Sequence, residues 1–579
     1  MWSFLRIIML VALMSLFNKE ADSQKKLTAA QWQFDIKYLQ NLIHSQYKNL
    51  FYNVTAKQFD SAVAVMHKRI PSLTEDEIKV EFFRLVAMFK IGHTYVRMKA
   101  GENPDSLYSP FRILPLNVYP FSDGLYIRQV HEKYKEALGG KVIKIGDDPV
   151  DKALEKLRFV VPCENEQLFK AELQFFIRVP EFLQALKISR SSDAVVFTYL
   201  KNGEVKTITI EAEAYPDYKH HLDMNPLSGW TDAYAEYNKP SSVLWMKEPD
   251  KFRYFEYLEK EKILYVRHSA VVQEGNETIE EFFNRVFQFA ETHEVDKLVL
   301  DIRLNGGGNN YFNKPVITGI IGLKKINRYG HFFVVLGEAT FSAAQNLTNE
   351  LEKYTECIFV GQPTSENVNF WGDTKTEVLP NSKLNLRLSW LWWQNMDPRD
   401  DRKYTAPQLA AGLSFDNYIS GFDSAMYVIQ NFKDEKPIDE KLKELVLNGN
   451  FEEARQTAIQ YKQNPLHRFI GSELETKLND KGYLLMMGGK IKEGSDLLLI
   501  QILLFPESIN AYDSYAESLL NLGKKDEAIK YYKIAVSKDP KGLTFAGTNS
   551  KKCCQNFNKH INMLLPGFLC FANFANKTR

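Results

Sequence analysis

The sequence predicts a multidomain protein built around a central α/β domain, and three observations lead to this fold class. Between about residues 263 and 354, short apolar strands alternate with amphipathic helical segments, an order typical of a largely parallel sheet. Near the N-terminus, apolar residues recur at helical spacing. After residue 433, segments with the character of helix pairs repeat with a period of 34 residues, which predicts stacked helical repeats.

Composition limits the classes of partner. With 579 residues the chain is too long for one hydrophobic core, because single cores stop growing at about 250–300 residues. The 73 basic and 72 acidic side chains nearly cancel, so we expect no nucleic-acid partner. The 5 cysteines do not form a disulfide framework, and none lies at ligand spacing with histidines. No metal ion and no cofactor are implied.

Residues 1–23 are predicted to be a cleavable signal peptide. Arg6 precedes an apolar run over 7–17, which is too short to span a bilayer but has the length of a signal-peptide core. Small side chains at Ala21 and Ser23 suit a signal peptidase, so the mature chain would begin at the next residue. The alternative is an uncleaved membrane anchor. Elsewhere no apolar run approaches the roughly eighteen residues of a transmembrane helix, so we expect no membrane span in the mature chain.

Two different segments are predicted before the central domain. Residues 24–104 are expected to be helical, because Trp32, Ile36 and similar later residues lie on one face of a helix. Residues 105–215 are expected to form strands with one or two helices. Within them, Asn202-Gly203 separates two alternating runs, which predicts a β-hairpin.

The central α/β domain is predicted over residues 216–432. Its expected strands are 263–267, 298–302 and 332–336, and its expected helices are 279–292 and about 342–354. Because these strands follow one another through helices, we expect them to be parallel and to end at one edge of the sheet.

Residues 433–541 carry the helical repeat. Gly489 of one copy is matched 34 residues later by Gly523, and this is the period of tetratricopeptide repeats. Two to three such repeats form a concave surface for a protein partner or an extended peptide. The alternative role is a stabilising appendage. Residues 542–579 do not continue the pattern, and we expect a disordered or anomalous tail there.

Two strand ends carry the residue types that acyl transfer needs. The strand at 298–302 is followed by Gly306–Gly308, whose backbone can turn sharply and direct N–H groups at a developing negative charge. The strand at 332–336 is followed by Ser342 at the start of a predicted helix, where the helix dipole favours negative charge. The alternative role for Ser342 is a helix N-cap, for which serine is a favoured residue.

Four segments together resemble the S41 serine peptidases, which comprise the tail-specific proteases and their tricorn-core relatives. The segments are GHT at 92–94, DIRLNGGGN at 301–309, TFSAAQN at 340–346 and GQPTSENVNFWGD at 361–373. The resemblance extends over about residues 28–425 and is to exported bacterial members. It implies a crotonase- or ClpP-like β/α core and a PDZ-like module at 105–215, which either captures peptides at a sheet edge or is purely structural.

The resemblance also assigns the nucleophile and the oxyanion donors. Ser342 would attack the substrate carbonyl. The N–H of Ala343 and that of Gly307 or Gly308 would hold the resulting oxyanion. Without such preorganised donors the negative charge of the tetrahedral intermediate would be poorly stabilised.

The residues expected to supply the general base depart from the family pattern in this chain. Tail-specific members use a lysine about two dozen residues after the serine, but here the stretch reads Thr364-Ser365-Glu366-Asn367 and the lysine is absent. Tricorn-like members use a histidine, whose position His93 matches, and imidazole is suited to proton transfer. Family members usually carry Asp before Gly-His-Thr, where this chain has Ile91. Glu366 would orient or charge-stabilise the base; the alternative for His93 is a hydrogen-bonded structural histidine.

The sequence therefore predicts an exported serine endopeptidase, periplasmic or extracellular, that hydrolyses polypeptides through an acyl-enzyme. The alternative is a catalytically silent S41-fold protein that binds peptides or scaffolds a complex of the cell envelope. The absent lysine, Ile91 and the repeats favour this alternative. A third hypothesis is that the protein performs acyl chemistry on a non-peptide substrate, on a crotonase-like core.

Overall fold

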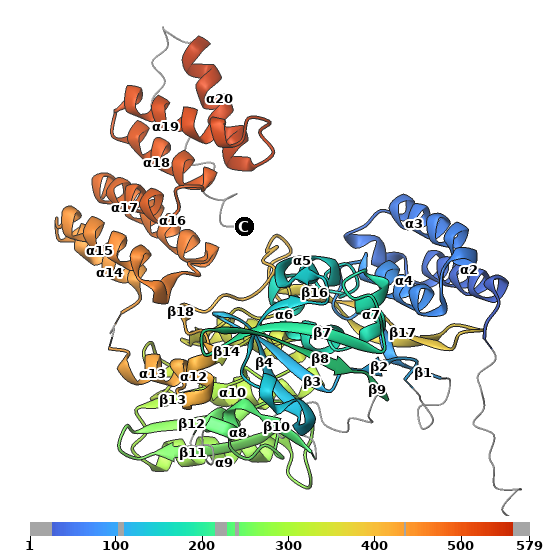
Figure 1. Ribbon diagram of the computed structural model, residues 1–579. Helices are drawn as coiled ribbons and strands as arrows, with labels where there is room; N and C mark the ends of the chain where they lie inside the picture. Colours follow the sequence, from blue (N-terminus) through green and yellow to red (C-terminus); the bar gives the residue numbers. More distant parts are fainter. Residues whose placement is uncertain (1–25, 102–108, 215–228, 238–242, 434–435, 560–579) are drawn as a thin grey trace, which may run out of the picture.

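The computed structural model describes residues 26–101, 109–214, 229–237, 243–433 and 436–559 (Figure 1). The predicted signal peptide at 1–23 lies outside these residues. Within the described ranges, no helix is both long enough and apolar enough to cross a membrane.

The described part of the chain begins with three α-helices, each preceded by a threonine. They are α2 (Ala29–Gln46), α3 (Ala56–Arg69) and α4 (Glu75–Ala87). Thr28, Thr55 and Thr74 form capping boxes with a Gln or Glu three residues on, so each helix start has its free N–H groups satisfied locally. The helices bury one face against the rest of the protein.

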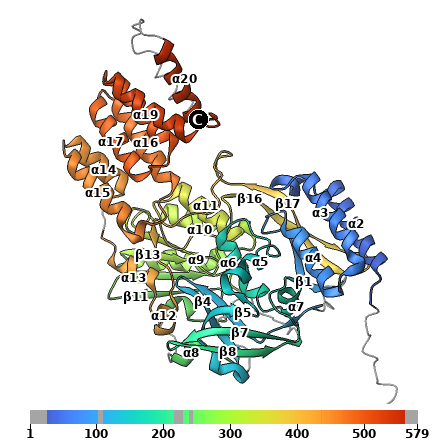
Figure 2. The same cartoon turned by 45° about the horizontal axis from the view of Figure 1, so that its top comes forward.

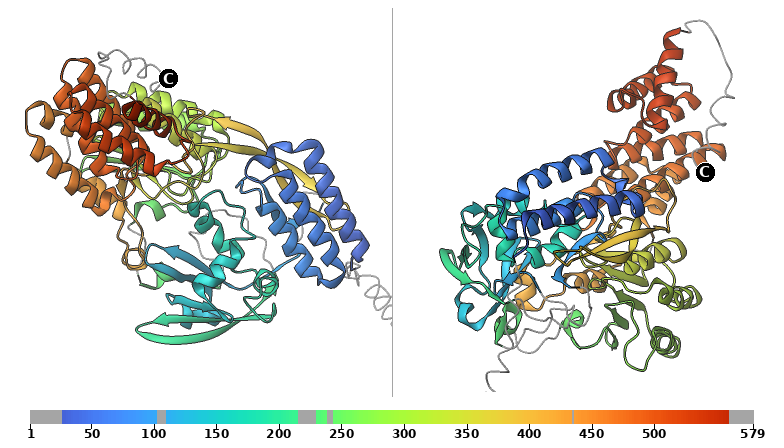
Figure 3. Two further views of the ribbon diagram at one scale, coloured as in Figure 1. Left: turned by 90° about the horizontal axis from the view of Figure 1, so that it is seen from above. Right: turned by 90° about the vertical axis from the view of Figure 1, so that its right-hand side faces the viewer.

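The prediction that residues 24–104 are helical throughout is wrong at its end, because Tyr95–Ala100 form strand β1. This strand pairs antiparallel with β17 (Leu384–Gln394), which in turn pairs with β16 (Asn369–Val378). The partner strand lies almost three hundred residues later in the chain, so local sequence does not reveal it. In Figure 3, β16 and β17 reach from the core to the N-terminal helices. His93 consequently lies immediately before a strand.

The second sheet has the strand order β10-β4-β5-β7-β8, with β3 and β6 paired at its side. Its strands are β3 (Leu116–Phe121), β4 (Gly124–His131), β5 (Lys141–Ile145), β6 (Asp148–Pro149), β7 (Ala194–Lys201), β8 (Glu204–Glu211) and β10 (Trp230–Asp232). Its helices are α5 (Val150–Leu157), α6 (Glu166–Phe176) and α7 (Pro180–Ala185). Strand β10 pairs with β4, so this sheet extends beyond residue 215.

The predicted hairpin joins β7 to β8. Asn202 and Gly203 have φ of 54° and 79°, as a two-residue turn of this hand requires, and Asn-Gly tolerates such angles best. The sheet, the three N-terminal helices and β17 share one continuous hydrophobic core, so these segments form a single body.

The central sheet has the order β11-β12-β13-β14-β15-β18, and every pair from β12 onward is parallel. The strands are β11 (Arg253–Leu258), β12 (Ile263–His268), β13 (Lys297–Asp301), β14 (Phe332–Leu336), β15 (Ile358–Gly361) and β18 (Leu409–Ala410). The helices are α8 (Ala233–Tyr237), α9 (Ile279–Thr292), α10 (Lys314–Gly322), α11 (Ala343–Tyr354), α12 (Phe415–Ser420) and α13 (Ser424–Asn431).

Both faces of the central sheet are buried, as expected for parallel strands. One face packs on α9, α10 and α11, and the other on α13. The predicted strands and helices of this domain are confirmed. Because β13 and β14 are parallel neighbours, the glycine loop after one and Ser342 after the other lie at the same sheet edge.

In the described residues from 436 to 559, seven α-helices extend away from the central domain as a stack (Figures 1 and 2). They are α14 (Ile438–Leu447), α15 (Phe451–Gln463), α16 (Ser472–Met487), α17 (Ile491–Leu504), α18 (Ile509–Asn521), α19 (Lys525–Lys538) and α20 (Phe545–Lys559). Their apolar side chains form two clusters of their own, separate from those of the rest of the protein.

Helix α20 corrects the expectation of a disordered or anomalous tail for the part that the structure describes. Its start is held by Asp539, which accepts hydrogen bonds from the N–H groups of Leu543 and Thr544. Ser550 Oγ donates a 2.6 Å hydrogen bond to the buried Asp513 of α18. These polar contacts hold α20 against α18. Residues 560–579 lie outside the described part.

Candidate active site

Ser342 lies in the sharp turn between β14 and α11. Its φ of 57° and ψ of −123° are unusual for a residue with a side chain, and such backbone strain costs about 1–3 kcal/mol and is concentrated at functional sites. Ser342 occupies the N-cap position of α11, but its side chain makes no capping hydrogen bond. The simple N-cap role is therefore wrong, and the hydroxyl is available for another contact.

That contact is with His93. The Nε2 atom of His93 lies 3.0 Å from Ser342 Oγ, although the two residues are 249 positions apart. The imidazole is stacked against the rings of Phe341 and Phe370, with centroid distances of 4.5 Å and 5.7 Å. These two contacts hold the plane of the ring, so Nε2 is directed at the hydroxyl.

Burial lowers the pKa of His93 to about 4. The imidazole is consequently neutral near pH 7 and able to accept the serine proton. Gly92, the preceding residue, allows this packing, because a Cβ there would lie 2.5 Å from Leu168 Cδ2 and 3.1 Å from the Phe341 ring.

Glu366 lies on the other side of the histidine. Its Oε2 atom accepts a 3.2 Å hydrogen bond from the N–H of Ser342 and lies 3.4 Å from His93 Nδ1. At that distance Nδ1 has no hydrogen-bond acceptor. Burial and the neighbouring Glu164 raise the pKa of Glu366 well above its usual range. The structure thus brings together the three predicted residues Ser342, His93 and Glu366.

The predicted oxyanion donors differ in whether their N–H groups already donate a hydrogen bond. The N–H of Gly307 already donates a 2.9 Å hydrogen bond to Asn305 Oδ1. The N–H groups of Gly308 and Ala343 make no hydrogen bond to another described residue. Gly308 and Ala343 are therefore the pair that can serve an oxyanion, and Gly307 shapes the loop. A Cβ on Gly307 would lie 2.7 Å from Ser342 Cβ and 2.8 Å from Ala343 N.

Sequence reasoning missed Glu164, which lies in the loop between α5 and α6. Its Oε1 atom accepts a 3.1 Å hydrogen bond from the N–H of Gly92. The carboxyl group also lies beside Glu366 and the backbone of Asn367, and each carboxyl group affects the pKa of the other. No local motif marks this residue, because its neighbours in the sequence do not take part in the site; only the tertiary fold identifies it.

No protein-family model matches the chain, and no curated protein matches its sequence. A serine-to-alanine mutant of CPAF superimposes with a TM-score of 0.50 at 12% identity, over 70% of this chain and 99% of that one. Mature CPAF gives 0.49 at 11%, covering 70% and 98%, and the photosystem II D1 C-terminal processing protease 0.34 at 11%, covering 70% and 98%.

The chain has an S41-peptidase fold. At 12% identity the likeness concerns the fold, and the chemistry has to follow from the side chains themselves. A cavity of about 610 Å³ lies at the edge where β13 and β14 end, and Phe341, the residue before Ser342, lines it.

The cavity lies between the central sheet and the second sheet. The glycine loop and Phe341 line one side, and Tyr119, Phe121, Leu168 and Phe175 line the other. Aromatic and apolar walls beside backbone donors are typical of a site that buries a peptide side chain. Two carboxyl groups, Glu172 and Glu338, also line the cavity, and burial raises the pKa of each to about 7.

Arg303 lies between the end of β13 and the glycine loop. Its guanidinium lies 2.8 Å from Asp301 and 3.0 Å from Asp423 at the start of α13. These two ion pairs connect the end of β13 with α13. Within the described residues, no group of three His, Cys, Asp or Glu side chains is arranged to hold a metal ion.

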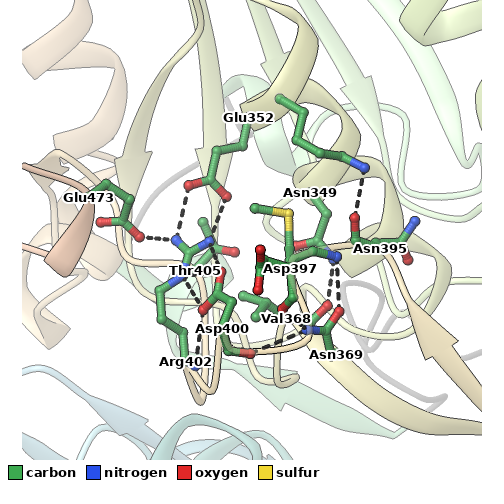
Figure 4. A network of polar contacts seen from close by, with 12 residues as sticks. Asn349, Glu352, Val368, Asn369, Asn395, Asp397, Asp400, Arg402, Thr405 and Glu473 are labelled. Atoms are coloured by element: carbon green, nitrogen blue, oxygen red, sulfur yellow. Dashed lines mark hydrogen bonds and ion pairs between the residues drawn. The ribbon is translucent and has the colours of Figure 1, made fainter. Parts of the chain in front are cut away.

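A polar network holds the helix that begins at Ser342 (Figure 4). Arg402 binds Glu352 of α11 at 2.9 Å and Asp400 at 2.8 Å, and it also contacts Glu473 of α16. Asn349 Nδ2 donates a 2.8 Å hydrogen bond to the carbonyl oxygen of Val368. One arginine therefore connects the catalytic helix with the C-terminal helices.

Proposed function

We propose that this protein is a serine endopeptidase that hydrolyses polypeptides through an acyl-enzyme on Ser342. The observation that carries the proposal is the 3.0 Å contact between Ser342 Oγ and His93 Nε2, made at a strained strand-to-helix turn. A serine needs a neighbouring base to be nucleophilic near neutral pH, and a neutral, fixed imidazole meets that need.

The reaction follows from these positions. Ser342 Oγ attacks the peptide carbonyl carbon while His93 Nε2 takes the hydroxyl proton. The oxyanion accepts hydrogen bonds from the N–H groups of Ala343 and Gly308, each of which is worth about 3 kcal/mol in such sites. His93 then gives its proton to the leaving amine. A water molecule, deprotonated by the same imidazole, attacks the ester and releases the new carboxyl end.

The lysine of the tail-specific pattern is not needed in this scheme, because the histidine occupies the base position. Glu366 holds the Ser342 backbone and faces His93 Nδ1. In the resting site this second contact is 3.4 Å, and catalytic hydrogen bonds commonly tighten when substrate is bound.

The proposal extends to the other modules and to the location. The second sheet would act as a PDZ-like module that adds an extended peptide at a free edge, which β8 offers. The C-terminal helices would act as tetratricopeptide repeats that bind a protein partner, supported by their 34-residue period. We place the protein outside the cytoplasm, in the periplasm or beyond, on the predicted signal peptide.

One observation favours a second candidate function. His93 Nδ1 lacks an acceptor, so the ring is less supported than in an ideal triad. A protein with this site could retain the fold and bind peptides without cleaving them.

The deciding experiment uses residues 24–579 and the variants Ser342→Ala and His93→Ala. We expect the parent to digest an unfolded protein and to be labelled by a serine-directed phosphonate, and both variants to lose digestion. Ser61→Ala, on the outer surface of α3, serves as the matched control and should behave as the parent. Peptide binding by a parent that is folded, inert and unlabelled would refute the peptidase and establish the silent binding protein.

A further inference from the structure

Two buried carboxyl groups meet behind the histidine, and each has an oxygen without a donor. Glu164 Oε2 and Glu366 Oε1 have no hydrogen-bond partner, and the two carboxyl groups lie close enough for each to perturb the pKa of the other. A hydrogen bond between two carboxyl groups requires a proton on one of them. A single proton between these two oxygens satisfies both.

The surroundings favour such a proton. Two neighbouring carboxylates that are both ionised repel each other strongly in a buried site. Burial raises the pKa of both groups, and the mutual repulsion raises that of Glu366 further. The charged or titratable groups that face the pair are His93, which is neutral near pH 7, and Lys403, whose charge acts on Glu164. The pair therefore carries one negative charge in total.

We propose that Glu164 is a positioning residue for catalysis at Ser342, and that it acts through a proton shared with Glu366. The role in catalysis rests on the proposed peptidase function, whereas the shared proton does not. Glu164 comes from the segment at 105–215, so the second sheet contributes to the catalytic centre.

Glu164 holds the backbone beside both members of the proton relay. It accepts a hydrogen bond from the N–H of Gly92, which precedes His93, and it lies beside the backbone of Asn367, which follows Glu366. One carboxylate thus fixes the separation of the base and its acidic partner. A displacement of about 1 Å in such a pair can cost a hundredfold in rate.

Movement of the shared proton also places negative charge on Glu366 when His93 becomes positively charged. As His93 takes the proton of Ser342, the imidazolium attracts negative charge at its Nδ1 side. The shared proton moves from Glu366 Oε1 to Glu164 Oε2, the negative charge passes to Glu366, and no proton leaves the pair. Glu366 is then a carboxylate beside the imidazolium, and it becomes a neutral acid again when His93 returns its proton.

The test compares Glu164→Gln with Glu164→Ala in the chain of residues 24–579. The glutamine side chain can accept a hydrogen bond from the N–H of Gly92 and donate one to Glu366, and the pair keeps the same single charge. Glu164→Gln should therefore retain most of the kcat that Glu164→Ala loses. We expect Glu164→Ala to lower kcat about a hundredfold. Glu166→Gln, an exposed neighbour paired with Arg158, is the matched control.

The pH profile separates positioning from a merely structural role. In the parent, kcat/KM should rise as the pH passes about 4, where His93 loses its proton. In Glu164→Gln this rise should come at higher pH, because Glu366 is then a carboxylate beside the imidazole. At alkaline pH the parent should lose activity when the shared proton leaves and both carboxylates are charged. Glu164→Gln should lack this alkaline loss.

Infrared spectroscopy tests the proton without any activity. The parent at neutral pH should show a protonated carboxyl C=O band that both Glu164→Gln and Glu366→Gln remove and Glu166→Gln retains. The shared proton is overturned if neither glutamine variant changes the band. The positioning role is overturned if folded Glu164→Ala keeps the parent rate, or if glutamine does no better than alanine. A silent parent that shows the band would refute the peptidase and not the shared proton.

Discussion

At the scale of single residues, the site depends on how closely two chain segments approach each other. Ser342 adopts its strained backbone directly against Gly307, whose own φ is 98°. The absence of a side chain at residue 307 lets the loop lie against Ser342 Cβ and Ala343 N. The nucleophile and the oxyanion donors are thus positioned by one contact between the ends of two parallel strands.

Substitution of this glycine tests the contact. Gly307→Ala should lower kcat/KM about a hundredfold or more, because the methyl group displaces either the serine or the Ala343 donor. Gly306→Ala is the matched control in the same loop, since a Cβ there meets no atom within 4 Å. Steady-state kinetics of both variants, with circular dichroism to verify folding, gives the comparison. Equal losses in the two variants would contradict this account.

The sequence could predict the residues that belong to local motifs and no others. Ser342, His93 and Glu366 each lie in a segment that resembles a family pattern, so their roles could be expected before their contacts were known. The hydrogen bond from the N–H of Gly307 to Asn305 could not be predicted, because Gly307 and Gly308 fit the family pattern equally well. Glu164 has no motif, and its function follows entirely from where the loop before α6 is placed.

At the scale of elements, α11 is held at both ends. Ser342 begins it, and Arg402 binds Glu352 in its last turns together with Asp400 (Figure 4). The guanidinium is only 15% exposed, so these carboxylates depend on it for their charge balance. Local sequence does not indicate this connection, for the same reason that β1 was expected to be helical: the partner is remote along the chain.

Removal of this arginine should therefore destabilise the protein. Arg402→Met is expected to cost about 3 kcal/mol, because it leaves partly buried carboxylates without a cation. Arg399→Met is the matched control three residues earlier, where the arginine and Asp397 are largely exposed. Unfolding in urea, followed by tryptophan fluorescence, measures the difference. A midpoint that shifts equally in both variants would show that the network does not hold α11.

At the scale of the whole molecule, the protein consists of a catalytic body and an attached stack of helices. The N-terminal helices and second sheet share one core, and the central sheet contributes the cores on its two faces. The helices from α14 onward bury their apolar residues among themselves. Polar contacts such as Arg402 with Glu473, and His467 with the carbonyl oxygen of Gln408 at 3.1 Å, link the two parts.

Separate cores predict separate folding. A chain of residues 24–433 should fold and should retain the kcat/KM of the full chain on a short peptide, because every residue of the site lies within it. On a long unfolded protein it should be slower if the helices bind substrate. A chain ending at residue 541 is the informative control: without α20, Asp513 loses Ser550 and Asn549, so only the helical stack should melt earlier. Calorimetry of the three chains decides, and failure of residues 24–433 to fold would show that the stack is part of one cooperative unit with the catalytic body.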